Sequence, residues 1–193
     1  TILKIYDYYQ IPKKGSVLLH ISLPWINSFY FRPEDEKLKL NTGFWGAALG
    51  LDYFYNNKQF LNFTASAVSD FFIPIPAAID LSGEFEFMSS YYFSLSNNHK
   101  INRLSMGYGI SYASNTWEIR YIDRFDPPPP TRDPIRKTWN SAGLVFSTYY
   151  QVGRRFNCGL IYRPTFIRTK TTDIFKYEHL ISINFAWIIR LKQ

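Results

Sequence analysis

The sequence predicts an all-β protein, an antiparallel up-and-down transmembrane β-barrel of eight strands with short turns at one end and long loops at the other. Three observations lead to this prediction. Apolar residues alternate with small or polar residues over most of the 193 positions, which is the period of a β-strand. Short polar turns alternate along the chain with longer connections. Aromatic residues make up 19% of the sequence, and Tyr and Trp favour membrane interfaces.

The alternation is clearest in the last stretch, 181–191. Phe185 and Trp187 fall on one face of a strand, and Asn184 and Arg190 fall on the other. No segment approaches the roughly 18 to 20 consecutive apolar residues that a transmembrane helix needs. We therefore expect strands, rather than helices, to cross the membrane.

The connections divide the chain into strands. Short polar segments at 55–59, 96–100 and 151–155 carry the Asn or Gly that hairpin turns favour, and longer segments lie between them. The predicted strands lie near 16–31, 42–55, 58–69, 80–95, 100–113, 138–151, 154–167 and 177–191. All the short turns then fall at one end of the barrel, together with both chain ends. We expect 1–15 to form a tail and 16–193 to form the barrel.

The composition of the two faces predicts which one meets lipid. The apolar face of every strand is free of charge, whereas the alternate face is small, polar or charged. An eight-stranded lumen is too narrow for the large aromatic residues, and Arg or Lys facing the midplane costs about 2–4 kcal/mol. We expect two outward aromatic belts, with Trp139 in the belt at the loop end. The predicted lipid-facing aromatics are Trp25, Trp45, Tyr53, Tyr112, Phe185 and Trp187.

Charged residues on the alternate face predict a polar lumen. They are Glu84, Glu86, Arg103, Arg163 and Arg190. Glu84 and Glu86 lie about as many residues from the short turn of their strand as Arg163 lies from the short turn of its own. We therefore expect Glu86, or Glu84, to form an ion pair with Arg163 across the lumen, which acts as a polar plug.

This pattern resembles the small eight-stranded outer-membrane β-barrel proteins of Gram-negative bacteria, over 16–191. The resemblance rests on the even strand number, the short turns at one end and the long loops at the other. It implies periplasmic turns, extracellular loops, a periplasmic tail at 1–15 and an integral position in the outer membrane. Outer-membrane lipid and lipopolysaccharide are the partners that it implies.

Charge and loop composition suggest further partners. The net charge of +7 is not gathered on a basic helix or stripe, so we do not expect nucleic-acid binding. Basic residues at the loop end are candidate contacts for lipopolysaccharide phosphates: Arg132, Arg136, Lys137, Arg168 and Lys170. The apolar loop 69–79 and the loop 113–137, which contains four consecutive prolines, are candidate contacts for a protein partner within a larger assembly.

One pair of residues bears on catalysis. His20 and Ser22 are similar to the His-x-Ser pair of the lipid A deacylases, which are also eight-stranded barrels. Those enzymes place the pair toward lipid, whereas parity, the alternation of odd and even strand positions between the two faces, points both residues inward here. In addition, Leu23 stands where that family typically has Asn. We therefore expect no catalytic role. The sequence predicts no metal site and no cofactor, and the single cysteine, Cys158, excludes an internal disulfide.

The sequence therefore predicts a non-enzymatic outer-membrane barrel with a structural or partner-binding role. Three alternatives remain open at this point. A lipid A-modifying enzyme needs a catalytic group at the lipid face, a narrow channel needs an open lumen, and a soluble lipocalin-like binder needs the apolar face inside.

Overall fold

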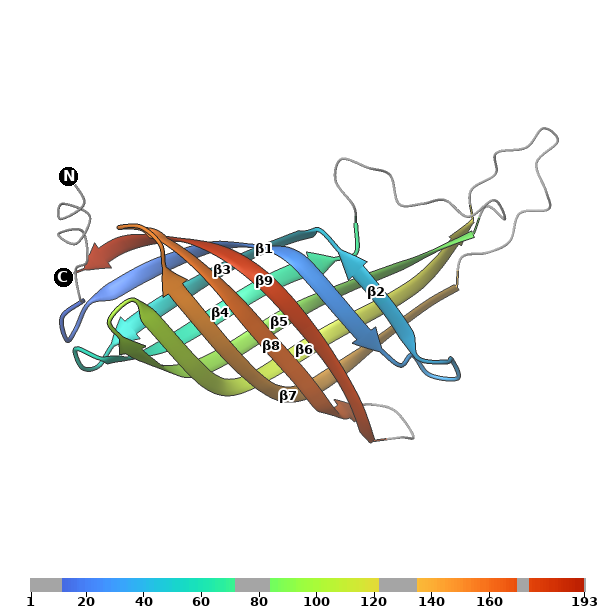
Figure 1. Ribbon diagram of the computed structural model, residues 1–193. Coiled ribbons are helices and arrows are strands. Elements are labelled where there is room, and N and C mark those ends of the chain that lie inside the picture. The colour runs from blue at the N-terminus through green and yellow to red at the C-terminus, as the bar shows by residue number, and fades with distance from the viewer. Residues whose placement is uncertain (1–11, 72–83, 122–134, 170–173, 193) are drawn as a thin grey trace.

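The computed structural model describes residues 12–71, 84–121, 135–169 and 174–192. These residues form one antiparallel sheet of nine strands, in the order β2-β1-β3-β4-β5-β6-β7-β8-β9, and β1 also pairs with β9. The sheet therefore closes into a barrel (Figure 1). The strands are β1 (Val17–Phe31), β2 (Lys39–Gly43), β3 (Trp45–Phe54), β4 (Gln59–Ser69), β5 (Glu84–Ile101), β6 (Leu104–Tyr121), β7 (Ile135–Gln151), β8 (Phe156–Thr169) and β9 (Phe175–Lys192).

The eight-stranded barrel is confirmed, and its second wall strand is interrupted. Both β2 and β3 pair with β1 in one continuous register, and Phe44 separates them. The facing part of β1 contains Pro24, which has no backbone N–H to donate. The Asn27 side chain donates to the carbonyl oxygens of Pro24 and Trp45, each at 3.0 Å. This amide replaces part of the missing backbone pairing.

One predicted turn was wrong. The segment 96–100 lies inside β5, and the chain reverses at Asn102 and Arg103, where Asn102 has a φ of 54°. Asn tolerates this left-handed conformation better than most residues. Asn98 points into the polar lumen and donates to Ser96, so the Asn-rich segment continues as a strand.

At the other end, β6 and β7 extend beyond their predicted ends, and together with β5 they project past the rest of the barrel (Figure 1). The predicted loop 113–137 is thus partly strand.

Two apolar layers fill the lumen at different heights. Near the short turns, Leu18, Phe54 and Phe60 form a small buried cluster. Toward the loop end lies a larger cluster that includes Phe29, Phe31, Met88, Tyr92, Trp117, Trp139 and Leu180. Phe29 and Phe31 point inward because a bulge in β1, between Pro24 and Ile26, reverses the alternation. Polar side chains occupy the space between the layers.

None of the described residues forms a helix long and apolar enough to cross a membrane.

Candidate functional site

The outer wall of the barrel is apolar. Ile21, Leu49, Phe63, Tyr91 and Ile110 lie on different strands, and between 44% and 63% of each residue's surface is exposed. No described outward position within the paired strands from Val17 to Leu23, Trp45 to Tyr53 or Ile181 to Ile189 carries Asp, Glu, Lys or Arg. A water-soluble protein rarely exposes so large a continuous apolar surface. The soluble lipocalin-like alternative needs the opposite orientation and is therefore wrong.

The predicted outward aromatics lie on this wall. Trp25, Trp45, Tyr53, Tyr112 and Trp187 are exposed. Phe185 is half-buried and stacks on Phe156, with their ring centroids 6.0 Å apart.

Trp139, by contrast, is wrongly predicted as a belt residue. Only 6% of its surface is exposed, and it lies inside the barrel, on the same face of β7 as Ser141. Its indole N–H donates to Glu178, so the polar edge of the ring is satisfied internally rather than at a membrane interface.

An aromatic cluster lies on the outer wall near the loop end. It joins Tyr30 of β1, Tyr162 and Phe166 of β8, and Tyr177 and His179 of β9. The rings of Tyr30 and His179 stack with centroids 4.5 Å apart, and the hydroxyl oxygens of Tyr162 and Tyr177 lie 2.7 Å apart. Phe166 packs on Tyr177 with the centroids at 5.7 Å. We call these five residues the seam cluster, because they cross the β1–β9 junction.

A buried ion pair closes the lumen toward the loop end. The Arg168 Nη2 atom lies 2.5 Å from Glu178 Oε1, and 1% of each side chain is exposed. Glu178 also accepts from the Arg32 backbone N–H at 2.8 Å and from the Trp139 indole at 2.8 Å. The Arg168 guanidinium lies over the Trp139 ring, 4.5 Å from its centroid. The sequence reasoning missed this site because a bulge in β8, between Thr165 and Ile167, turns Arg168 inward.

These contacts correct part of the predicted lipopolysaccharide site. Arg168 is almost fully buried and its charge is engaged by Glu178, so it is not the exposed basic group that the sequence predicted. Lys137 is half-buried and forms an ion pair with Glu36, with Nζ and Oε1 3.3 Å apart. Arg136 is exposed. Arg132 and Lys170 lie outside the described residues.

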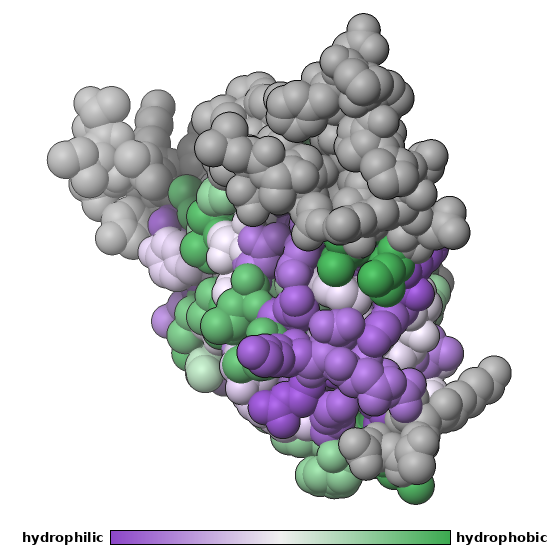
Figure 2. Space-filling view, turned by 90° about the vertical axis from the view of Figure 1, so that its right-hand side faces the viewer, coloured by the Kyte–Doolittle hydropathy of each residue, from purple (hydrophilic) through white to green (hydrophobic). Residues whose placement is uncertain are grey.

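The described surface at the loop end carries charges of both signs. Figure 2 shows this end, where hydrophilic residues cover much of the surface. The charged residues that line a hollow of about 400 Å³ there are Glu34, Asp35, Arg136, Lys137 and the largely buried Arg168. The mixture of acidic and basic groups gives this rim a smaller positive charge than the predicted basic cluster implied.

The predicted ion pair between Glu86 and Arg163 is wrong. Glu86 instead pairs with Lys39, with Oε1 and Nζ 2.5 Å apart, and accepts from the Trp117 indole at 3.3 Å. Arg163 is buried deeper in the lumen, as its parity predicted, and its guanidinium lies 4.9 Å from the centroid of the Tyr92 ring. Parity assigned both residues to the correct face of their strands. The height of Glu86 in the barrel was wrong, because it was counted from a misplaced β5–β6 turn. The Glu84 side chain lies outside the described part of the structure.

Two other predicted lumen charges lie at the barrel's end. Arg103 belongs to the turn after β5 and is half-buried. Arg190 is exposed and lines a depression near the short turns with Arg154 and Arg155. Both residues are too close to the strand ends to reach the lumen interior, so neither contributes to the plug.

His20 and Ser22 lie on the inward face of β1, and at most 9% of either residue is exposed. The His20 ring meets Tyr149 edge-on, with the centroids 5.3 Å apart. This position is inside the wall, whereas the deacylase arrangement requires the pair at the lipid face.

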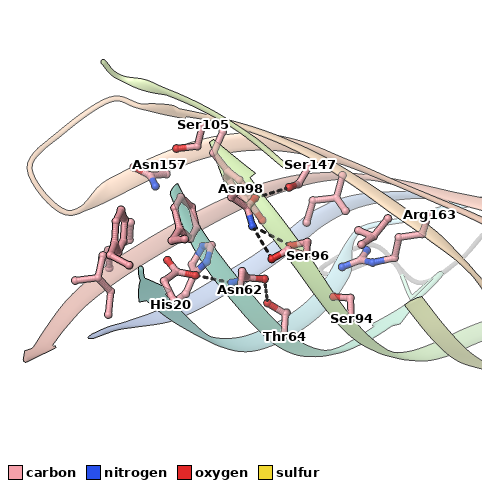
Figure 3. Close-up of a pocket in the computed structure, with 18 residues that line it drawn as sticks. His20, Asn62, Thr64, Ser94, Ser96, Asn98, Ser105, Ser147, Asn157 and Arg163 are labelled. Atoms are coloured by element: carbon pink, nitrogen blue, oxygen red, sulfur yellow. Dashed lines mark hydrogen bonds between the residues drawn. The ribbon is translucent and has the colours of Figure 1, made fainter. Parts of the chain in front are cut away.

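A small cavity with both apolar and polar side chains in its lining, which we call the lumen chamber, lies between the two apolar layers. Its volume is about 40 Å³, enough for a few water-sized groups. Asp52 accepts from the Asn62 amide at 2.6 Å within it. Figure 3 shows His20 toward the short-turn side of the chamber and Arg163 toward the loop side. Its polar lining includes Asp52, Asn62, Ser94, Ser96, Asn98 and Asn157.

Comparisons with known proteins identify the fold. No protein-family model matches the chain, and no curated protein matches it in sequence. Ail, the attachment invasion locus protein of Yersinia pestis, superimposes with a TM-score of 0.57 at 11% identity, over 91% of this chain and 99% of Ail. Ail in complex with the heparin analogue sucrose octasulfate gives a TM-score of 0.50 at 11% identity, over 91% and 99%. Neisserial surface protein A gives 0.50 at 9% identity, over 92% and 100%.

This chain has the fold of a small outer-membrane β-barrel. The predicted resemblance is thereby confirmed for the fold.

Proposed function

We propose that this chain is an integral protein of the Gram-negative outer membrane, with its short turns in the periplasm and its long loops outside. The observation that carries the proposal is the charge-free apolar wall, from Val17 at one end of β1 to Ile189 in β9. Such a wall suits a hydrocarbon environment because its side chains are apolar. The closed barrel also pairs its backbone N–H and C=O groups between strands, so no unpaired sheet edge faces the lipid.

The central test places a charge at two heights on the wall. Leu49 lies in the middle of β3, opposite Ile21 and Ala65, and Leu40 lies in β2 near the loop end; both side chains are exposed. Leu49→Arg is expected to lose about 2–4 kcal/mol of folding free energy in lipid vesicles, and Leu40→Arg about 0–1 kcal/mol. Urea unfolding followed by tryptophan fluorescence measures both. Equal tolerance of the two substitutions, with a monodisperse protein in the absence of detergent, would refute the membrane position.

We propose further that the protein is not an enzyme and serves a structural or partner-binding role. The inward position of His20 and Ser22 supports this, since lipid substrates approach from outside the wall. The loops 69–79 and 113–137 remain the proposed protein contacts, and most of their residues lie outside the described ranges. The segment 1–15 is proposed as a periplasmic tail.

Polyanionic saccharide, including the phosphorylated core of lipopolysaccharide, is the proposed ligand class at the loop end. Support comes from Arg136, which is exposed and lines the hollow, and from Arg32 and Lys37, which are exposed in the connection between β1 and β2. The complex of Ail with a sulfated heparin analogue supports the same ligand class. Arginine forks suit sulfate and phosphate oxygens.

A matched pair of substitutions tests this ligand class. Arg136→Ala is expected to weaken binding of sulfated oligosaccharide or purified lipopolysaccharide severalfold, measured by surface plasmon resonance at low salt. Lys58→Ala removes an exposed charge at the opposite end, in the turn before β4, and is expected to leave binding unchanged. If both variants bind as the wild type does, the rim is not the binding site.

A further inference from the structure

Arg163 is a buried charge whose hydrogen-bonding capacity the protein leaves largely unused. Only 1% of its surface is exposed. Its Nη2 atom donates to Ser66 Oγ at 3.4 Å, a long contact, while Nε and Nη1 have no hydrogen-bond partner in the protein. A guanidinium carries five N–H donors, and burying a charged group without partners costs several kcal/mol. The face of the Tyr92 ring compensates for part of this cost.

No carboxylate neutralises this guanidinium among the described residues. Glu178 is engaged by Arg168, and Glu86 is engaged by Lys39. Asp52 also lines the lumen chamber but accepts from Asn62. The positive charge therefore faces the chamber without an ion-pair partner.

The surroundings of Arg163 supply further donors. Ser94 and Ser96 line the chamber together with Arg163, whose guanidinium points into it (Figure 3). Ser96 Oγ accepts from the Asn98 amide at 2.9 Å, which leaves its own hydroxyl hydrogen free to donate. Ser94 is buried and lines the same space. A positive group and two hydroxyls thus line the same cavity of about 40 Å³.

The geometry points to a binding site for a small monovalent anion of the halide class, held in the lumen chamber by Arg163, Ser94 and Ser96. A single negative charge balances the guanidinium, and a spherical ion fits a small cavity with donors on several sides. A divalent oxyanion suits it less well, because Asp52 lines the same chamber and repels a doubly charged anion more strongly than a singly charged one. This inference concerns the lumen and does not depend on the proposed partner or membrane role.

Bromide serves as the probe. Crystals of the full chain, folded in detergent micelles and grown in sodium bromide, are expected to give an anomalous scattering peak in the chamber beside Arg163. Water alone at this position, or bromide only on the outer surface, overturns the inference.

A stability measurement tests the same site independently. Binding to the folded state alone should raise the thermal midpoint of the wild type by about 3–6 °C per tenfold rise in bromide above the dissociation constant, relative to sodium gluconate at equal ionic strength. Arg163→Met keeps an apolar stem and should abolish the rise. Ser94→Ala, a milder change, should reduce it and keeps the test valid if the Met variant does not fold. An equal rise in the wild type and in Ser94→Ala, together with no anomalous peak, contradicts the site.

Discussion

Glu178 is the most extensively bonded carboxylate among the described residues. It forms an ion pair with Arg168 and accepts hydrogen bonds from the Arg32 backbone N–H and the Trp139 indole N–H, and it is completely buried. Because removing one partner leaves the other charge buried and uncompensated, Glu178→Gln is expected to lower the free energy of unfolding by about 3–5 kcal/mol. Urea titration of the protein in lipid vesicles measures the loss.

Glu86→Gln is the matched control for this substitution. Its pair with Lys39 has a similar distance, but 41% of the Glu86 side chain is exposed, so the expected loss is about 0–1 kcal/mol. Similar losses for the two variants would show that burial does not set the strength of these pairs.

At the scale of single residues, the sequence predicted the face of a side chain better than its partner. Parity placed His20 and Arg163 inside the barrel correctly. Arg168 was predicted as a basic residue at the loop end, beyond a strand that stopped at 167; in the structure a bulge in β8, which nothing in the local composition marks, turns its side chain inward. The partners of Arg163 and Glu86 depend on the relative heights of strands, which parity does not contain.

The hairpin between β5 and β6 provides a prediction at the scale of elements. Asn102 is exposed and adopts a φ of 54° in a two-residue turn. A β-branched residue is strained there, so Asn102→Val is expected to destabilise the protein by about 1–3 kcal/mol, whereas Asn102→Gly should be nearly neutral. Urea unfolding in vesicles compares the two. Equal stability of the variants would place the turn elsewhere, for example at the predicted 96–100.

Strand positions were largely predictable, because the outward face has a uniform apolar character over many residues. Turn positions were less so. A polar lumen accepts Asn at inward positions, so the segment around Asn98 has a composition typical of a turn and yet remains in β5. The interruption at Phe44 was not predicted, since it arises from Pro24 on the neighbouring strand. Its cause is therefore a pairing between strands rather than a local sequence signal.

The whole barrel has a lumen that is filled at two heights. Leu18, Phe54 and Phe60 occupy it near the short turns, and the Arg168–Glu178 pair occupies it toward the loop end with the larger apolar cluster. The chamber between them has a volume of only about 40 Å³. Such a lumen matches the narrow interior of eight-stranded barrels, which side chains fill, and differs from the aqueous channel of 16- to 18-stranded porins.

We therefore expect no ion conduction through this barrel, which bears on the narrow-channel alternative. The purified full chain, reconstituted in planar bilayers in molar potassium chloride, should produce no stable conductance steps, while an open porin in the same bilayers serves as the positive control. A halide ion bound beside Arg163 would not alter this expectation, because the apolar layers on both sides offer no polar path for an ion to leave. Reproducible unitary steps that are lost when the protein is omitted would mean that these layers move apart in the membrane, and would restore the channel as the function to be explained.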